Sequence, residues 1–449
     1  MRFPVLSLLF LFIISLSFHN PISAQCLDDQ KSLLLTLFDS EDNDLSWTPN
    51  TDCCSWEGIT CDSSTGHVIG LDLTNQSISG SINSTSLISI SSLQSLNLSL
   101  NHFNCSIPSG LDSLSNLTHL NLSFSGFTGL VPIEVSRMKS LVSLDLSFLF
   151  SLALPSPDFG YLIGNLTGLR ELHLDGIQIS APVPEFMVEL VNLSSLHLVY
   201  CNLSGEFPSN NLSGRVPSSL FMTPSFKTID LSSNNFQGEI EWLGNLTRLI
   251  HLSLSDNDFS GQIHSLSSLA QLESLSFSRN RFHGQISSLA NLSQLSYLDL
   301  SSNHFSGQFP SLNSTCLLSL DLSSNSFSGR IPSSLFMIPS LRTIQLNHNQ
   351  FDGQLDEFHN ASVALSGIFL SNNKLQGQIP RSVGQLVGLS ILDLSWNNFN
   401  ELQIIDLSSN GFTGIWMVWG PLIFWANGRR WYYKQMDKLL IMAKAWWER

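Results

Sequence analysis

One phrase of hydrophobic and polar residues recurs from about residue 71 onward: Leu-x-x-Leu-x-Leu-x-x-Asn-x-Phe/Leu-x-Gly-x-Ile-Pro. Its alternating Leu-x-Leu piece predicts a short strand whose leucines point inward and whose x residues point outward. One copy cannot bury its apolar face alone, so we expect the copies to stack, each adding a parallel strand. The asparagine position falls at Gln76, Asn101, Ser125, Leu149, Ile177, Cys201, Asn234, Asn257, Asn280, Asn303, Asn325, Asn349, Asn373 and Asn397.

The spacing of these positions identifies the architecture. Most successive positions lie 22 to 25 residues apart, which is the signature of the leucine-rich repeat. An asparagine amide both donates and accepts hydrogen bonds, so it can satisfy backbone groups that the bend after each strand leaves unpaired. We therefore predict an α/β solenoid over residues 67–414: a curved leucine-rich-repeat superhelix with a parallel β-sheet on its concave side. About fourteen strands at roughly 4.8 Å each give an arc of ~70 Å.

Three places depart from the regular spacing. An extra asparagine, Asn210, follows the Cys201 position after only nine residues, and Asn397 and Asn410 are 13 apart. A half-length copy cannot add a full turn to the stack, so we expect spliced repeats near 202–211 and 398–410. The interval from Leu149 to Ile177 is 28 residues and predicts a small bulge.

The first 24 residues have the pattern of a secretory signal peptide. Arg2 precedes an almost wholly apolar run from Val5 to Phe18, and small residues before Gln25 offer a cleavage site. A membrane anchor is the alternative, but the run is short and ends at this site. We therefore predict that residues 1–24 direct the chain into the secretory pathway.

Four of the seven cysteines, Cys26, Cys53, Cys54 and Cys61, cluster in residues 25–66. In an oxidising compartment they predict two disulfides that staple a small N-terminal cap. A zinc site is the alternative, but no histidine accompanies them at zinc-ligand spacing, and two adjacent cysteines fit one tetrahedron poorly. The remaining cysteines are scattered, and their state is open.

The amino-acid composition argues against several structural and functional classes of protein. Leu and Ser supply 78 and 77 of the 449 residues, and 12% of residues are charged. The 43% hydrophobic content argues against disorder, and the scarcity of Ala, Glu, Lys and Arg argues against a coiled coil. The net charge of −15 argues against a nucleic-acid partner.

The last segment, residues 415–449, differs from the repeats. It holds six of the ten tryptophans and has a charge of +4. Its apolar run, 415–426, is 12 residues long and contains a Gly-Pro pair, whereas a spanning helix needs about 20. We expect no spanning helix here. Residues 431–449 could lie on a membrane surface, but we favour unselected sequence from a frameshift or a wrong gene structure.

Fourteen Asn-x-Ser/Thr sites suit the same secretory route. Two of them, Asn97 and Asn121, occupy outward strand positions, where glycans would mask the first strands, so we expect ligand recognition to avoid those strands. Five others precede a core leucine on the far side of the coil and are predicted to carry glycans: Asn116, Asn165, Asn192, Asn245 and Asn291.

No paired carboxylates, nucleophile with a base, phosphate loop or metal cluster appears at a persuasive spacing, so we predict a non-enzymatic protein without cofactor or metal. A ligand is expected to bind the outward strand positions, which tolerate substitution without disturbing the core. The richest patch covers three consecutive strands; exposed aromatic residues that merely cover the bulge are the alternative. Its residues are Phe148, Glu171, His173, Asp175, His197 and Tyr200.

The cap sequence carries a family resemblance. Cys26-Leu-Asp-Asp-Gln-Lys-Ser-Leu-Leu, Leu45-Ser-Trp and Asp52-Cys-Cys-Ser-Trp-Glu-Gly-Ile-Thr-Cys61 resemble the cap of plant extracellular leucine-rich-repeat proteins. The resemblance is greatest to receptor-like proteins of the tomato Verticillium-resistance kind and covers roughly residues 1–414. It implies disulfides Cys26–Cys53 and Cys54–Cys61.

The resemblance also implies a function. Such proteins lie on the outer face of the plasma membrane, bind peptide or protein ligands in defence or ligand perception, lack a kinase and signal through a partner receptor kinase. Members usually have more repeats, a C-terminal cysteine cap and a spanning helix, so this chain is expected to be truncated and, if complete, extracellular. The alternatives are a secreted glycosidase inhibitor, similar to polygalacturonase-inhibiting proteins, and a degenerate receptor fragment.

Overall fold

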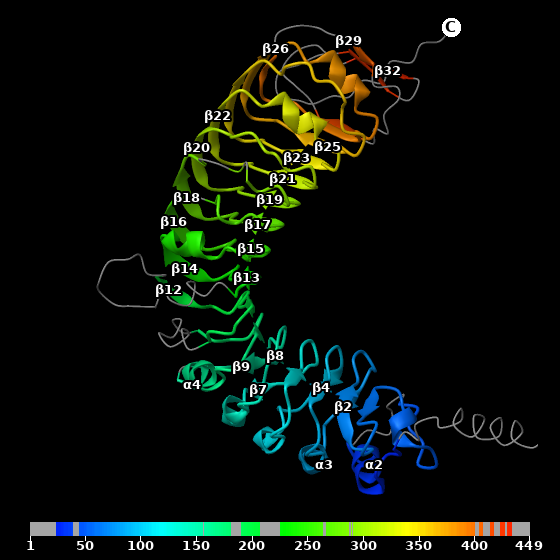
Figure 1. Ribbon diagram of the computed structural model, residues 1–449. Coiled ribbons are helices and arrows are strands. Elements are labelled where there is room, and N and C mark those ends of the chain that lie inside the picture. The colour runs from blue at the N-terminus through cyan, green and yellow to red at the C-terminus, as the bar shows by residue number, and fades with distance from the viewer. Residues whose placement is uncertain are drawn as a thin grey trace, which may run out of the picture. The chain divides into compact units, whose positions relative to one another are not determined.

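The computed structural model in Figure 1 describes residues 24–38, 45–155, 157–180, 190–206 and 225–399, apart from 264, 265, 287, 288 and 290. Beyond residue 399 it describes four short strands. The chain divides into two compact units, Met1–Ala153 (unit 1) and Leu154–Arg449 (unit 2). All but the last residue of the predicted signal peptide lies outside the described residues, as does most of the predicted tail.

Unit 1 begins with the cap and continues into the first repeats. Four strands are parallel and in register in its main sheet: β2 (Val68–Asp72), β4 (Ser95–Asn97), β6 (His119–Asn121) and β8 (Ser143–Asp145). The cap strand β1 (Ile59–Cys61) pairs antiparallel with β2. Shorter pairs and helical turns connect these strands: α2 (Asp28–Leu35), η1 (Cys53–Ser55), β3 (Ser79–Gly80), α3 (Ser84–Ser89), β5 (His102–Phe103), η2 (Leu111–Ser113), β7 (Gly129–Leu130), η3 (Ile133–Arg137) and β9 (Leu152–Ala153).

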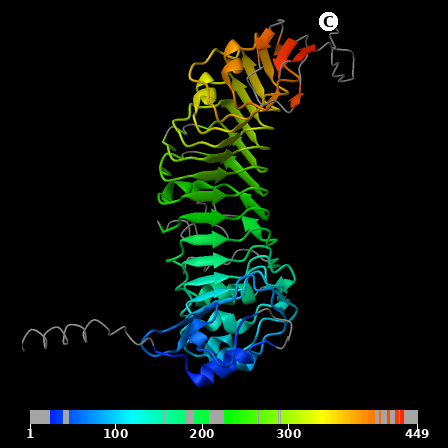
Figure 2. The same cartoon turned by 90° about the vertical axis from the view of Figure 1, so that its right-hand side faces the viewer.

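The main sheet of unit 2 contains eleven described parallel strands, and the ten before the last one, β30 (Gly414–Trp416), are stacked in one direction in Figure 2. These are β10 (Glu171–His173), β11 (Ser195–His197), β13 (Thr228–Asp230), β15 (His251–Ser253), β17 (Ser274–Ser276), β19 (Tyr297–Asp299), β21 (Ser319–Asp321), β23 (Thr343–Gln345), β25 (Gly367–Phe369) and β27 (Ile391–Asp393). With β30 and the four strands of unit 1 they make fifteen described parallel strands, against about fourteen predicted, and the predicted solenoid with its disulfide-bonded cap is confirmed.

A second parallel sheet, which we call the lateral sheet, runs through unit 2. It follows the Phe-x-Gly part of the repeat, and three helical turns, η6 (Glu241–Asn245), η7 (Ser333–Met337) and η8 (Arg381–Gln385), lie between its strands in the chain. The strands are β12 (Ser204–Glu206), β14 (Asn235–Gly238), β16 (Asp258–Gln262), β18 (Arg281–Gly284), β20 (His304–Gln308), β22 (Ser326–Gly329), β24 (Gln350–Gly353), β26 (Lys374–Gly377) and β28 (Asn398–Phe399).

The core of unit 2 consists of inward leucines and a row of stacked phenylalanines. In β15, Leu252 is buried while His251 is exposed, as the alternating pattern predicts. Successive phenylalanine rings lie 5.9 to 6.2 Å apart between centroids and are all but fully buried, which gives each repeat a large apolar contact with the next. They are Phe236, Phe259, Phe282, Phe305, Phe327 and Phe351.

The predicted role of the repeated asparagine is confirmed. Asn257 donates from Nδ2 to the carbonyls of Leu231, Leu254 and Ser255 at 2.9 to 3.2 Å, and its Oδ1 accepts from the Phe236 amide at 3.0 Å. The same pattern recurs at Asn280, Asn303, Asn325, Asn349, Asn373 and Asn397. Each asparagine therefore satisfies backbone groups of two repeats at once.

The irregular intervals have structural counterparts where they are described. The long interval before Ile177 holds the helix α4 (Asp158–Asn165). Near the C-terminus, β29 (Ile404–Asp406) does not join β27; it pairs with β31 (Ile423–Ala426), which pairs with β32 (Arg429–Tyr432). Instead β30 (Gly414–Trp416) lies beside β27, so the boundary expected between 414 and 415 falls inside a strand. Half of the first expected splice, 207–211 of 202–211, lies outside the described residues.

Candidate ligand-binding surface

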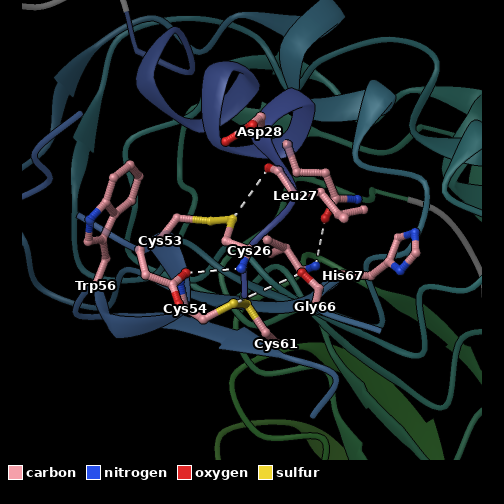
Figure 3. Close-up of a disulfide and its surroundings, with 12 residues drawn as sticks. Cys26, Leu27, Asp28, Cys53, Cys54, Trp56, Cys61, Gly66 and His67 are labelled. Carbon is pink, nitrogen blue, oxygen red and sulfur yellow. Dashed lines mark hydrogen bonds between the residues drawn. A yellow bond between two sulfur atoms is a disulfide. The ribbon is translucent and has the colours of Figure 1, made fainter. Parts of the chain in front are cut away.

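The cap closes the first repeat of unit 1 with two disulfides, Cys26–Cys53 and Cys54–Cys61, which Figure 3 shows and which the family resemblance implied. Asp52 is part of the same cluster, and its Oδ1 accepts from the amides of Cys26 and Cys54, both at 3.0 Å. Together these side chains are close enough to hold a metal ion, but their sulfur atoms are bonded to one another.

The buried side chain of Gln30 fastens helix α2 of the cap to the repeats. Its Oε1 accepts from the Val68 amide at 2.7 Å, and its Nε2 donates to Ser92 Oγ at 2.9 Å. Both are direct hydrogen bonds, and a buried amide left without hydrogen-bond partners would cost free energy. The cap therefore covers the end of the main sheet at β2.

From β10 to β23, each main-sheet strand of unit 2 presents two outward side chains, one on each side of a buried residue. The first row begins Glu171, Ser195, Thr228 and His251, and the second begins His173, His197, Asp230 and Ser253. Parallel pairing keeps each row in register, so neighbouring side chains in a row are about 4.8 Å apart along the sheet. This regular surface brings together three of the predicted ligand-binding residues, Glu171, His173 and His197.

We call His173, Asp175, His197 and Asp230 the histidine cluster. The imidazole rings of His173 and His197 have centroids 4.4 Å apart. His173 Nε2 shares a hydrogen bond with Ser195 Oγ at 2.9 Å, and His197 Nδ1 lies 3.8 Å from Asp175 Oδ2. Asp230 follows His197 in register on β13.

Burial controls the chemistry of this cluster. It raises the pKa of the Asp230 carboxyl, against the opposing effect of hydrogen bonds from Ser232 and of His197. Beneath the sheet, burial raises the pKa of the Cys201 thiol to about 12, with the Asp175 charge contributing, so this cysteine is a packed thiol and not a nucleophile. Its Sγ donates to the Leu174 carbonyl at 3.1 Å.

The residue before each repeated asparagine adopts a left-handed backbone, which turns its side chain toward solvent. Tyr200 has φ +58° and is 69% exposed, beside but outside the main-sheet rows. Phe148 has φ +59° at the equivalent position of unit 1. Polar residues occupy several other copies, including Ser233 and Asp256, as expected where bulky side chains are disfavoured.

Phe148 belongs to unit 1, whereas the other five predicted ligand-binding residues belong to unit 2. Its ring stacks on that of Phe124 with centroids 4.2 Å apart and meets Phe150 edge-on at 5.9 Å. Phe124 and Phe150 are 47% and 56% exposed. Phe148 is therefore the centre of an apolar patch whose other two members the sequence prediction missed.

The comparisons with known proteins agree with this geometry. A family model described as "Leucine-rich repeat region" matches residues 67–366, and one described as "Leucine rich repeat N-terminal domain" matches residues 27–62. The chain belongs to the leucine-rich-repeat family.

Its relatives are plant receptor-like proteins, which confirms the predicted resemblance. This leucine-rich-repeat protein is 38% identical to Receptor-like protein 6 of Arabidopsis thaliana over 204 residues, covering 43% of this chain and 20% of the relative. It is 40% identical to Receptor-like protein Cf-9 of Solanum pimpinellifolium over 192 residues, covering 42% and 21%. The matches thus span about a fifth of the length of these relatives.

Solved structures show the same fold. The leucine-rich-repeat chain matches the Arabidopsis receptor kinase HAESA, in complex with the peptide hormone IDA and the co-receptor SERK1, with a TM-score of 0.68 and 29% identity. That match covers 84% of this chain and 71% of HAESA. PEPR1 with AtPEP1 gives a TM-score of 0.68 and 28% identity, covering 84% of this chain and 56% of PEPR1.

All five asparagines predicted to carry glycans on this leucine-rich-repeat protein are exposed: Asn116, Asn165, Asn192, Asn245 and Asn291. By contrast, Asn97 and Asn121 are half-buried, and their Oδ1 atoms accept from the amides of Ser99 and Ser123. The exposed set therefore stays the stronger prediction for glycosylation. Among the described residues, no helix has the length and apolar character to cross a bilayer.

Proposed function

We propose that this chain is the ligand-binding part of a plant receptor-like protein and acts by binding, not by catalysis. The observation that supports it is the outward face of the unit 2 main sheet, where a rigid in-register surface carries Glu171, the two histidines of the cluster and nearby Tyr200. Histidine and tyrosine side chains offer both hydrogen bonds and flat contact area, which suit a peptide or protein ligand.

The relatives support a proposal for the partner and the place of action of this chain. HAESA, a structural neighbour, is bound to a peptide hormone and a co-receptor. We infer by analogy that this chain acts outside the cell at the plasma membrane and that a receptor kinase with its own extracellular repeats completes the signalling complex.

Capture from plant extracellular and membrane fractions tests this function. The tagged, secreted chain is compared with a variant carrying Glu171→Ala, His197→Ala and Tyr200→Ala. A matched control carries Gln237→Ala, Asp258→Ala and Gln350→Ala, which are exposed changes on the lateral sheet.

We expect a receptor kinase and a peptide in the captured material, and we expect the peptide to be lost at least tenfold in the main-sheet variant only. Capture of a secreted glycosidase in place of a kinase would establish the inhibitor alternative. Equal recovery with both variants would refute the main-sheet surface as the binding site.

A further inference from the structure

We propose that an open pocket beside the last described strands of the lateral sheet binds a short, uncharged oligosaccharide. Residues of β24, β26 and β28 line it, and β26 is labelled in Figure 1. Its volume of about 700 Å³ falls within the ~300–1,000 Å³ range of small-molecule sites. The pocket shares no residue with the histidine cluster, so this proposal does not depend on the proposed peptide-binding function.

Asparagine dominates the lining of this pocket, where it supplies five of the nine lining residues. Three of the five are repeat asparagines whose side chains already bond to the backbone: Asn349, Asn373 and Asn397. The other two, Asn372 and Asn398, make no side-chain hydrogen bond to any other residue that the structure describes. These two side chains therefore offer a ligand both amide donors and amide acceptors.

Trp396 supplies the large exposed apolar surface of the pocket. It is 59% exposed, whereas Phe399, the other aromatic residue in the lining, is buried. The backbone of Trp396 is left-handed, with φ +55°, at the position before a repeat asparagine. In the preceding copies, from Ser233 to Asn372, this position holds polar residues. A bulky side chain is disfavoured in this conformation, and residues held in such strained conformations cluster at functional sites.

The charges around the pocket favour an uncharged ligand. Lys374 on β26 is the only charged residue among those that line it. Lys374 is in register with Asp352 on β24, and both side chains are exposed, so the carboxylate offsets the charge of the ammonium group. The pocket thus has no excess charge to attract an ionic ligand.

A sugar matches this combination of side chains. Each sugar hydroxyl both donates and accepts hydrogen bonds, as an asparagine amide does. A pyranose ring also has a flat face of C–H groups, and that face can stack on the indole of Trp396 and shield it from water. A purely apolar ligand would cover the amides of Asn372 and Asn398 without pairing them, which costs free energy. A neutral oligosaccharide pairs the amides and covers the indole at once.

A glycan array probed with the tagged, secreted chain tests the site. The array carries neutral hexose and N-acetylhexosamine oligomers beside uronic-acid oligomers, and isothermal titration with the best neutral oligomer then measures Kd. We expect Trp396→Ser, and separately the double variant Asn372→Ser/Asn398→Ser, to weaken binding at least about tenfold. Serine already occupies the equivalent positions of an earlier repeat, Ser324 and Ser326, so these changes suit the fold, and thermal melts verify it.

The matched control is Tyr161→Ala. Tyr161 is a 55% exposed aromatic residue of α4 that does not line the pocket, so this variant is expected to keep the wild-type affinity. Trp396→Phe, which keeps an aromatic ring, should retain more affinity than Trp396→Ser. The proposal would be overturned by a chain that binds no neutral oligomer, by binding confined to uronic-acid oligomers, or by an equal loss of affinity in the Tyr161 variant.

Discussion

Asn303 joins two repeats through four hydrogen bonds. Its Nδ2 donates to the carbonyls of Phe277, Leu300 and Ser301, and its Oδ1 accepts from the amide of Phe282. Asn303→Asp keeps the shape but turns a buried donor into a charged acceptor that faces these carbonyls. We expect the free energy of unfolding to fall by about 3–5 kcal/mol at pH 7 in urea denaturation.

The control for this change is Asn235→Asp, an exposed asparagine on β14. Because water can solvate the new carboxylate there, we expect a change within about 0.5 kcal/mol. Equal effects at the two positions would show that the repeated asparagine contributes nothing special to stability.

Gly307 illustrates a second single-residue constraint. Its φ is +77°, and a Cβ there would lie 2.7 Å from Gln285 Cγ of the preceding repeat. Gly307→Ala is therefore expected to destabilise unit 2 by about 1–2 kcal/mol in urea denaturation, from the left-handed backbone and the displaced glutamine together. Adding Gln285→Ala should recover part of this loss, because it removes the contact but not the backbone strain.

Gly244 gives the matched comparison. It has no left-handed φ, and no atom lies within 4 Å of the position its Cβ would take. Gly244→Ala should leave stability unchanged or raise it slightly. A loss as large as that at Gly307 would contradict the conformational explanation.

At the scale of single residues, the sequence predicted the features that recur in every repeat. It did not predict which residues have a left-handed backbone. Inward leucines and the bonding role of asparagine follow from alternation and amide chemistry. The left-handed residue before the asparagine does not, since Phe124 and Tyr200 give no sign of a positive φ in their identity. Reading that position across all copies would have added Phe124 to the candidate patch.

Carboxylates on neighbouring strands of the main sheet repel one another. Asp299 on β19 and Asp321 on β21 are in register, and burial, reinforced by Asp299, raises the pKa of the Asp321 carboxyl above its usual 3.8. The folded state then binds a proton more readily than the unfolded state, so this group costs stability as the pH rises through its folded pKa. Asp321 opposes folding most at neutral pH.

Asp321→Asn should therefore raise the melting temperature at pH 7, with the gain shrinking as the pH falls toward 3.8. Asparagine can keep the turn, since Asn97 and Asn121 accept the same amide bond at equivalent positions of unit 1. Asp258→Asn, on an exposed lateral-sheet position, is the control. A gain that is independent of pH would point to a cause other than ionisation.

Among whole elements, the main sheet was predictable and the lateral sheet was not. The main sheet follows from the alternating Leu-x-Leu pattern. Lateral strands such as β18 have a single buried residue, Phe282, and a glycine, so they show no alternating pattern in the sequence. The helix α4 was missed for a similar reason, because a spacing of 28 shows extra length without showing its conformation. His173 and His197 were predicted as neighbours because they fall on consecutive outward positions, whereas Asp230, in register with His197 on the next strand, was not among the predicted residues.

At the scale of the whole molecule, the positions of N-linked glycans indicate which asparagines are exposed to solvent in the secreted protein. Glycopeptide mapping of secreted chain is expected to find Asn116, Asn165, Asn192, Asn245 and Asn291 modified, because all five are exposed beside a buried leucine. Modification at the half-buried Asn97 and Asn121 would extend the glycan cover to the main sheet of unit 1. Finding the exposed five unmodified in secreted protein would contradict the assignment of these faces.

The two cap disulfides should differ in their contribution to the stability of unit 1. Cys26–Cys53 closes a separation of 27 residues and Cys54–Cys61 one of 7. Loop-closure entropy then gives about 3.6 kcal/mol for the first and about 2.4 kcal/mol for the second. Calorimetry of the two double variants, Cys26→Ser/Cys53→Ser and Cys54→Ser/Cys61→Ser, measures these contributions. The first variant should lose more of the stability of unit 1. The melting transition of unit 2 should not shift and serves as the internal control. If unit 2 melted earlier by the same amount, the chain would unfold as one cooperative body, and the cap would stabilise every repeat and not only the end that it covers.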